Sequence, residues 1–122
     1  MKIKHFLLAR KLSKKSTHSQ HKLGCCLVKG NRIIGLGFNQ DKTSPKSTNP
    51  FNTLHAEVSA IINADEEDIK GSVAYVYRET RLGTLGMSKP CKFCSEMLRS
   101  LGVKAVYYTS PEGYQQENYD VL

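Results

Sequence analysis

Long apolar runs are absent from this 122-residue sequence, and no stretch approaches the roughly 18 residues that a membrane-spanning helix needs. The first ten residues are interrupted early by basic side chains and hold too short an apolar stretch for a secretory signal. Repeats, low-complexity tracts and a dividing linker are also lacking. We therefore expect one domain over residues 1–122, with a cytoplasmic location and no membrane partner.

Cysteine is scarce, with four residues in the chain. An even number permits two disulfides, but the absence of a secretory leader favours free thiols. Cys25 and Cys26 are adjacent in an apolar run, where a strand would direct their side chains to opposite faces. We expect both to be small buried residues. Cys91 and Cys94 are separated by two residues and remain available for chemistry.

Acidic residues are almost missing from the first half of the chain. Residues 1–50 contain eleven Lys and Arg but a single acid, Asp41, whereas residues 51–122 contain seven basic and ten acidic residues. The two halves therefore carry +10 and −3, which together give the net charge of +7. This asymmetry fits an anionic partner such as a nucleotide phosphate or a nucleic-acid backbone, and it fits equally well a solvated basic face.

The hydrophobic pattern predicts alternating helices and strands. Apolar residues recur at helical spacing near the N-terminus, and we expect the buried face there to hold Ile3, Phe6, Leu7, Leu8 and Leu12. His5, His18 and His21 are expected at the surface. The predicted order is helix 3–13, strand 23–28, strand 33–38, a helix from about 54 to 64, strand 72–78, helix 90–100 and strand 104–109.

The connections between these elements set the fold. Gly30 and Asn31 favour a hairpin between the first two strands. A helix joins the third and fourth strands, so they should be parallel neighbours. We expect an α/β fold, a three-layer α-β-α sandwich with a mixed four- to five-stranded sheet. The tail after Ser110 fits a short helix or an edge strand. Residues 65–68 are expected to be the solvated end of the preceding helix. Residues 40–53 are expected to form a long loop, with Thr53 capping the next helix.

Two short motifs carry chemistry: His55-Ala56-Glu57 and Pro90-Cys91-Lys92-Phe93-Cys94. One imidazole and two thiols are a ligand set typical of catalytic zinc, which keeps a fourth position open. Both motifs lie at expected helix starts, with Pro90 in the first turn of its helix, and the helix terminus there favours thiolates at Cys91 and Cys94. Glu57 is then placed to move protons as an acid or base, without ligating the metal.

Other interpretations of each motif explain less of the sequence. A Cys-x-x-Cys pair alone would fit a redox pair or half of a zinc ribbon, but a ribbon requires a second pair and a redox pair has no use for His55. A purely structural zinc site would normally close with a fourth protein ligand. We therefore expect a catalytic zinc site.

The two motifs resemble the cytidine/deoxycytidylate deaminase superfamily, whose pattern is H-x-E followed by P-C-x-x-C. The resemblance extends from about Gly24 to Thr109 and includes the order of helices and strands. It implies a cytidine deaminase-like fold with one zinc ion per chain. The residues it assigns are His55, Cys91 and Cys94 as zinc ligands, Glu57 as general acid/base, the Ala56 backbone as a contact to the base ring, and Asn39 as a contact to the sugar.

This resemblance implies hydrolytic deamination of cytosine to uracil, on a free nucleotide such as dCMP or CMP. A deaminase of cytosine or adenine in single-stranded DNA or RNA is the alternative, because of the basic N-terminal half. By analogy with the family we also expect a homo-oligomer. Residues 79–89 form a longer connection than typical nucleotide-specific members of the family have. Arg81 and Lys89 of this connection, together with Lys42 and Lys46, would either hold a phosphate or remain solvated.

Overall fold

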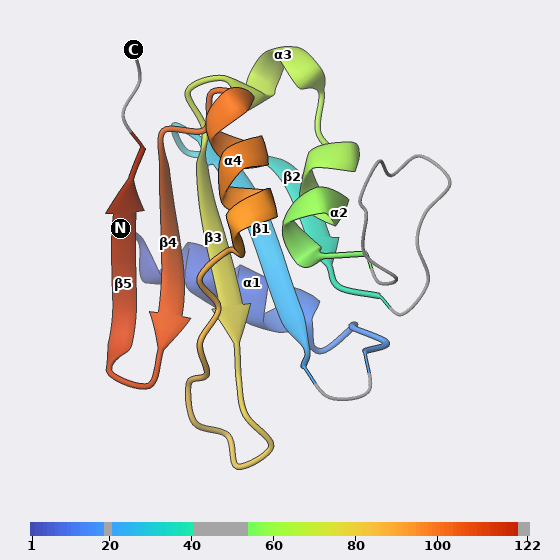
Figure 1. The fold of residues 1–122 in the computed structure, drawn as a ribbon, viewed down its shortest axis with the longest axis vertical. Helices are drawn as coiled ribbons and strands as arrows, with labels where there is room; N and C mark the ends of the chain where they lie inside the picture. Colours follow the sequence, from blue (N-terminus) through green and yellow to red (C-terminus); the bar gives the residue numbers. More distant parts are fainter. Residues whose placement is uncertain (19–20, 41–53, 120–122) are drawn as a thin grey trace.

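The computed structural model describes residues 1–18, 21–40 and 54–119. They form one five-stranded sheet in the order β2-β1-β3-β4-β5, with α2 and α4 on one face and α1 on the other (Figure 1). The three-layer α/β fold with a mixed sheet is therefore confirmed. The elements are α1 (Ile3–Ser13), β1 (Leu23–Lys29), β2 (Arg32–Phe38), α2 (Ala56–Ile62), α3 (Glu66–Ile69), β3 (Val73–Arg78), α4 (Lys92–Ser100), β4 (Ala105–Ser110) and β5 (Gly113–Asn118).

The strand pairing follows from the lengths of the connections. β1 and β2 form the predicted antiparallel hairpin, and Gly30 takes the positive φ of 64° that its turn requires. β1 also pairs antiparallel with β3. β3 and β4 are parallel because the chain between them crosses over through α4. Within the tail after Ser110, residues Gly113–Asn118 form an antiparallel edge strand, β5, and not a helix.

The sheet separates two apolar clusters. Cys25, Leu27 and Val76 face α2 and α4, whereas Cys26, Val28 and Tyr77 face α1. Cys25 and Cys26 thus point to opposite faces of β1 and are both fully buried, as the sequence predicts. Burying these side chains supplies the main driving force that holds the helices on the sheet.

The buried face of α1 differs from the sequence-based expectation. Phe6 and Leu12 are buried, but Ile3 and Leu7 are 47% and 49% exposed. His5, expected at the surface, is 4% exposed and packs against Tyr75, with their ring centroids 5.1 Å apart. The buried face of α1 instead includes the small residues Ala9 and Ser13, whose backbone atoms lie against Gly24 of β1.

Burial of His5 predicts a pH-dependent stability. Burial lowers the pKa of His5, and the nearby charges of Lys4, Lys2 and the N-terminal amine lower that pKa further. Its buried Nε2 has no hydrogen-bond partner among the described residues. Below the ordinary pKa of 6.5, the unfolded chain binds a proton that the folded chain does not, so acidification favours unfolding. When the pH is lowered from about 7.5 to about 5.5, we expect the free energy of unfolding to fall less in His5→Phe than in the wild-type chain. Urea unfolding at both pH values measures this difference. An equal loss in both proteins would contradict this assignment.

Three local expectations need correction or lie outside the described part. α4 begins at Lys92 with Cys91 as its N-cap, so Pro90 precedes the helix and is not in its first turn. Residues 66–69 form a short helix, α3, where only a solvated exit was expected. Thr53, Lys42, Lys46 and the loop from 41 to 53 lie outside the described residues. Within the described ranges, no helix is long and apolar enough to span a bilayer.

Candidate metal centre

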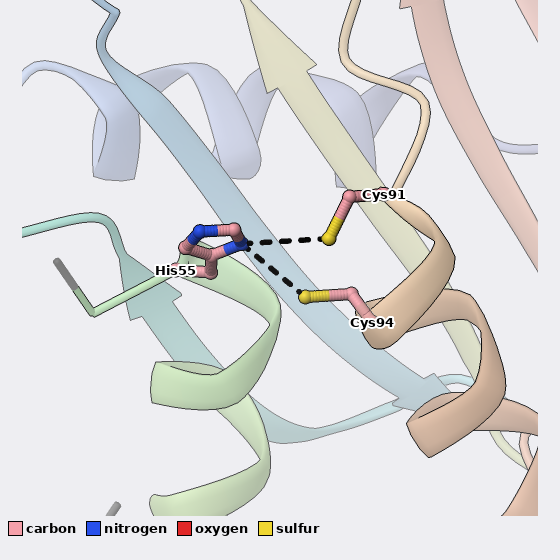
Figure 2. A group of neighbouring side chains, drawn as sticks. All are labelled: His55, Cys91 and Cys94. Carbon is pink, nitrogen blue, oxygen red and sulfur yellow. Dashed lines mark hydrogen bonds between the residues drawn. The ribbon is translucent and has the colours of Figure 1, made fainter. Parts of the chain in front are cut away.

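His55 is held at the start of α2 by the end of β2. Gln40 and Leu54 exchange two backbone hydrogen bonds of 2.9 Å each, which ties the residue before His55 to the residues that follow β2. His55 is the N-cap residue with extended backbone angles, but its side chain does not cap the helix. The imidazole is therefore directed away from the helix terminus and toward α4 (Figure 2).

A close contact between strand and helix fixes this helix start further. A Cβ added at Gly37 of β2 would lie 2.3 Å from the Ala60 nitrogen and 2.6 Å from the Ala56 carbonyl oxygen. Backbone atoms cannot yield to such overlap as a flexible side chain can. We expect Gly37→Ala to lower the free energy of unfolding by about 1–3 kcal/mol or more and to weaken zinc binding, because α2 must shift. Urea unfolding and zinc titration would test this, with the exposed Leu36→Ala as the matched control that keeps zinc affinity.

Cys91 and Cys94 are positioned by the segment that joins β3 to α4. Buried Ser88 donates a hydrogen bond from Oγ to the Val76 carbonyl at 2.8 Å and accepts one from the Thr109 amide at 2.7 Å. Thr109 Oγ1 in turn donates to the Gly86 carbonyl at 2.7 Å. These bonds attach the approach to α4 to the ends of β3 and β4. Sequence reasoning missed both residues, since neither belongs to a motif.

The three predicted ligands converge (Figure 2). His55 Nδ1 lies 3.4 Å from Cys94 Sγ and 3.8 Å from Cys91 Sγ, and all three ligand atoms lie within 4.8 Å of one another. Tetrahedral zinc, with Zn–N of about 2.0 Å and Zn–S of about 2.3 Å, separates N and S ligands by about 3.6 Å. The arrangement therefore fits zinc. Among the described residues, this metal-binding group has three protein ligands, which leaves one tetrahedral position for water or substrate.

Burial controls the protonation of the thiol nearest the core. Cys94 is fully buried, and burial raises the pKa of its thiol, with the Glu57 carboxylate adding to the rise. At this position burial outweighs the helix terminus that was expected to favour the thiolate. The positive charge of a divalent cation is what would stabilise a thiolate here, as metal ligation requires.

Glu57 is the second residue of α2, and its exposed fraction is 3%. Burial raises the pKa of its carboxyl to about 7, although hydrogen bonds from its own backbone amide and from Cys94 oppose that rise. A carboxyl with this pKa exchanges protons readily near neutral pH, which suits a general acid/base. It accepts a hydrogen bond from the Cys94 thiol and is not part of the metal-binding group.

A second imidazole lies near this centre, contrary to expectation. The positive charge of His18 lowers the pKa of His55, after the larger effect of burial. His18 also stands beside His21, with ring centroids 5.9 Å apart. His18 was expected at the surface because it lies outside the two motifs, and no sequence pattern connects it to His55, which is 37 positions away.

The two predicted substrate-binding residues lie at the start of α2 and directly after β2. Ala56 is the first residue of α2 and is 1% exposed. Asn39 follows β2, where its side-chain oxygen accepts a hydrogen bond from the Leu23 amide at 2.8 Å and its side-chain nitrogen donates to the His21 carbonyl at 2.5 Å. Asn39 thus holds the chain before β1 against the end of β2. Its contact to a sugar stays a prediction.

Comparison with known proteins identifies the family of this chain. Residues 1–110 match the family described as the cytidine and deoxycytidylate deaminase zinc-binding region. The chain belongs to this family. The match includes the His-Cys-Cys group, so zinc is the metal that this group is suited to hold.

Individual relatives agree with this membership. Deoxycytidylate deaminase of Schizosaccharomyces pombe is 30% identical over 84% of this chain and 35% of its own length, and the human enzyme is 26% identical over 86% and 62%. The apo crystal structure of dCMP deaminase from cyanophage S-TIM5 superposes with a TM-score of 0.70 at 31% identity, covering 90% of this chain and 86% of that one. The chain thus spans about one third to two thirds of the length of these two curated relatives.

Proposed function

We propose that this chain is a zinc-dependent hydrolytic deaminase that converts the cytosine base of a free nucleotide, dCMP first, to uracil. The carrying observation is the convergence of His55, Cys91 and Cys94 beside a buried carboxyl, Glu57. We assign the first three as zinc ligands and Glu57 as the catalytic acid/base. Asn39 and the Ala56 backbone are proposed as contacts to the sugar and base.

The chemistry divides between the metal and one side chain. Zinc held by the three ligands would supply a Lewis acid able to activate water at neutral pH. Glu57 accepts a proton from that water and delivers it to N3 of the ring while oxygen adds at C4. Glu57 then takes the proton of the hydroxyl group now on C4 and transfers it to the exocyclic nitrogen, so that a C4=O bond forms, the C4–N4 bond breaks and ammonia leaves. A carboxyl with a pKa of about 7 is suited to both accepting and donating that proton.

The relatives favour a mononucleotide over a polynucleotide substrate. Those from Schizosaccharomyces pombe and human are deoxycytidylate deaminases, and a second S-TIM5 structure, 31% identical to this chain, is a complex with dCMP and dUMP. This supports dCMP as the first substrate to test. A single domain over residues 1–122, self-association and a cytoplasmic location remain predictions.

A substrate screen tests the proposal. Zinc-loaded protein is incubated with dCMP, CMP, deoxycytidine, cytidine, adenosine and a cytosine-containing single-stranded oligonucleotide, and ammonia release is measured. We expect turnover of dCMP to exceed that of the other compounds, and the same protein stripped by a chelator to be inactive until zinc is restored. Turnover confined to the oligonucleotide, or none with any cytosine compound, would contradict the proposal.

A further inference from the structure

A cavity lies at the end of the sheet on the side covered by α1. Its volume is about 390 Å³, within the usual range of ligand pockets. It is bordered by the C-terminal end of α1 (Lys14), by the residue before β1 (Lys22), and by the segment that follows β3 (Glu79, Thr80 and Arg81). In Figure 1 this last segment extends past the end of β3. None of these residues belongs to the metal-binding group.

The cavity carries an excess of positive charge. Lys14, Lys22 and Arg81 line it, against a single carboxylate, Glu79. That carboxylate is already engaged: it lies 2.6 Å from Lys14 Nζ and 3.4 Å from Arg10 Nε, and it accepts a 2.8 Å hydrogen bond from the Tyr77 hydroxyl. The negative charge of Glu79 is therefore balanced by Arg10 and Lys14, at the C-terminal end of α1.

Two of the lining cations have no anionic partner among the described residues. Lys22 Nζ donates to the Ser16 carbonyl at 3.2 Å, a contact that leaves its charge unbalanced. Arg81 is exposed and forms no hydrogen bond or ion pair with any residue in the described ranges. Two unbalanced cations match the charge of about −1.5 to −2 on a phosphate group near neutral pH, and an arginine fork binds phosphate oxygens in pairs.

We propose that this cavity binds the phosphate group of a phosphorylated small molecule, with Lys22 and Arg81 as the residues that recognise it. Two sources offer the same chemistry. One is the 5′-phosphate of the nucleotide that the zinc centre acts on, and this source rests on the proposed function. The other is a second phosphorylated molecule, which requires no deaminase activity.

Calorimetric titration of the zinc-loaded full chain with inorganic phosphate tests the site. We expect Arg81→Glu and Lys22→Glu to weaken phosphate binding by about tenfold or more. The matched control is Lys15→Glu, an equal charge change at an exposed residue next to the cavity but not lining it, and it should alter binding less than about twofold. Undetectable phosphate binding to the wild-type chain, or equal weakening in all three variants, would overturn the proposal.

Kinetics with dCMP and deoxycytidine then separate the two sources. If the substrate phosphate occupies the cavity, Arg81→Glu raises KM for dCMP and leaves KM for deoxycytidine unchanged. If a second molecule occupies it, both KM values stay unchanged although phosphate binding is lost. Either outcome supports the site. Absence of deamination by the wild-type chain would count against the proposed function alone, because the phosphate titration is read independently.

Discussion

Replacing Glu57 with Gln should lower kcat by about 10³-fold or more while one zinc ion per chain is retained. The amide has nearly the same shape as the carboxyl, so α2 keeps its packing against β2. It cannot, however, accept the proton from water or deliver one to the base. Because Glu57 is 3% exposed, no bulk base replaces it easily. Ammonia release and elemental zinc analysis on the same preparation measure both effects.

The matched control for this variant is Glu96→Gln on α4. Glu96 is exposed and lies outside the metal-binding group, so removing its charge should leave kcat within about twofold of the wild type. Near-normal turnover in Glu57→Gln would end the assignment of this carboxyl as acid/base. Loss of zinc together with activity would instead show that Glu57 maintains the metal site.

Replacing Cys91 with Ser should abolish zinc binding at equimolar metal and remove the stabilisation that zinc gives to the fold. A ligand that binds only the folded chain stabilises it by about 4 kcal/mol when its free concentration is about 1,000 times its Kd. Serine supplies a much weaker, protonated oxygen in place of a thiolate. Thermal melting with and without added zinc measures this stabilisation, and the expected zinc-dependent shift in Tm disappears in the variant.

Two comparisons isolate the ligand effect from simple loss of a cysteine. Cys91 is exposed, so wild type and Cys91→Ser should melt at nearly the same temperature once both are stripped of metal. Cys26→Ala removes a buried thiol on the α1 side of the sheet and should keep one zinc per chain. A Cys91→Ser variant that is active and fully loaded with zinc would contradict the ligand set.

Much of the fold could be predicted because local patterns and tertiary packing agree. The hairpin of β1 and β2 follows from two apolar runs around Gly30, and the parallel pairing of β3 and β4 follows from the helix between them. The edge strand β5 was harder to predict. Its sequence, Gly-Tyr-Gln-Gln-Glu-Asn, has little apolar alternation, and its position depends on backbone pairing with β4.

The ligand set could be predicted because its chemistry is carried by residue type and spacing. His55 and the Cys91/Cys94 pair come from two helix starts, and the topology brings those starts to one end of the sheet. The supporting contacts could not be predicted in this way. Ser88 and Thr109 act through hydrogen bonds between segments 21 residues apart, and the proximity of His18 to His55 depends on how the chain before β1 folds.

X-ray absorption at the zinc edge tests the central claim most directly. It is measured on the full chain purified with zinc, together with elemental analysis of the same sample. We expect one zinc ion per chain with two sulfur ligands at about 2.3 Å and nitrogen or oxygen ligands at about 2.0 Å. A chain without zinc, or zinc without sulfur in its coordination shell, would contradict the account.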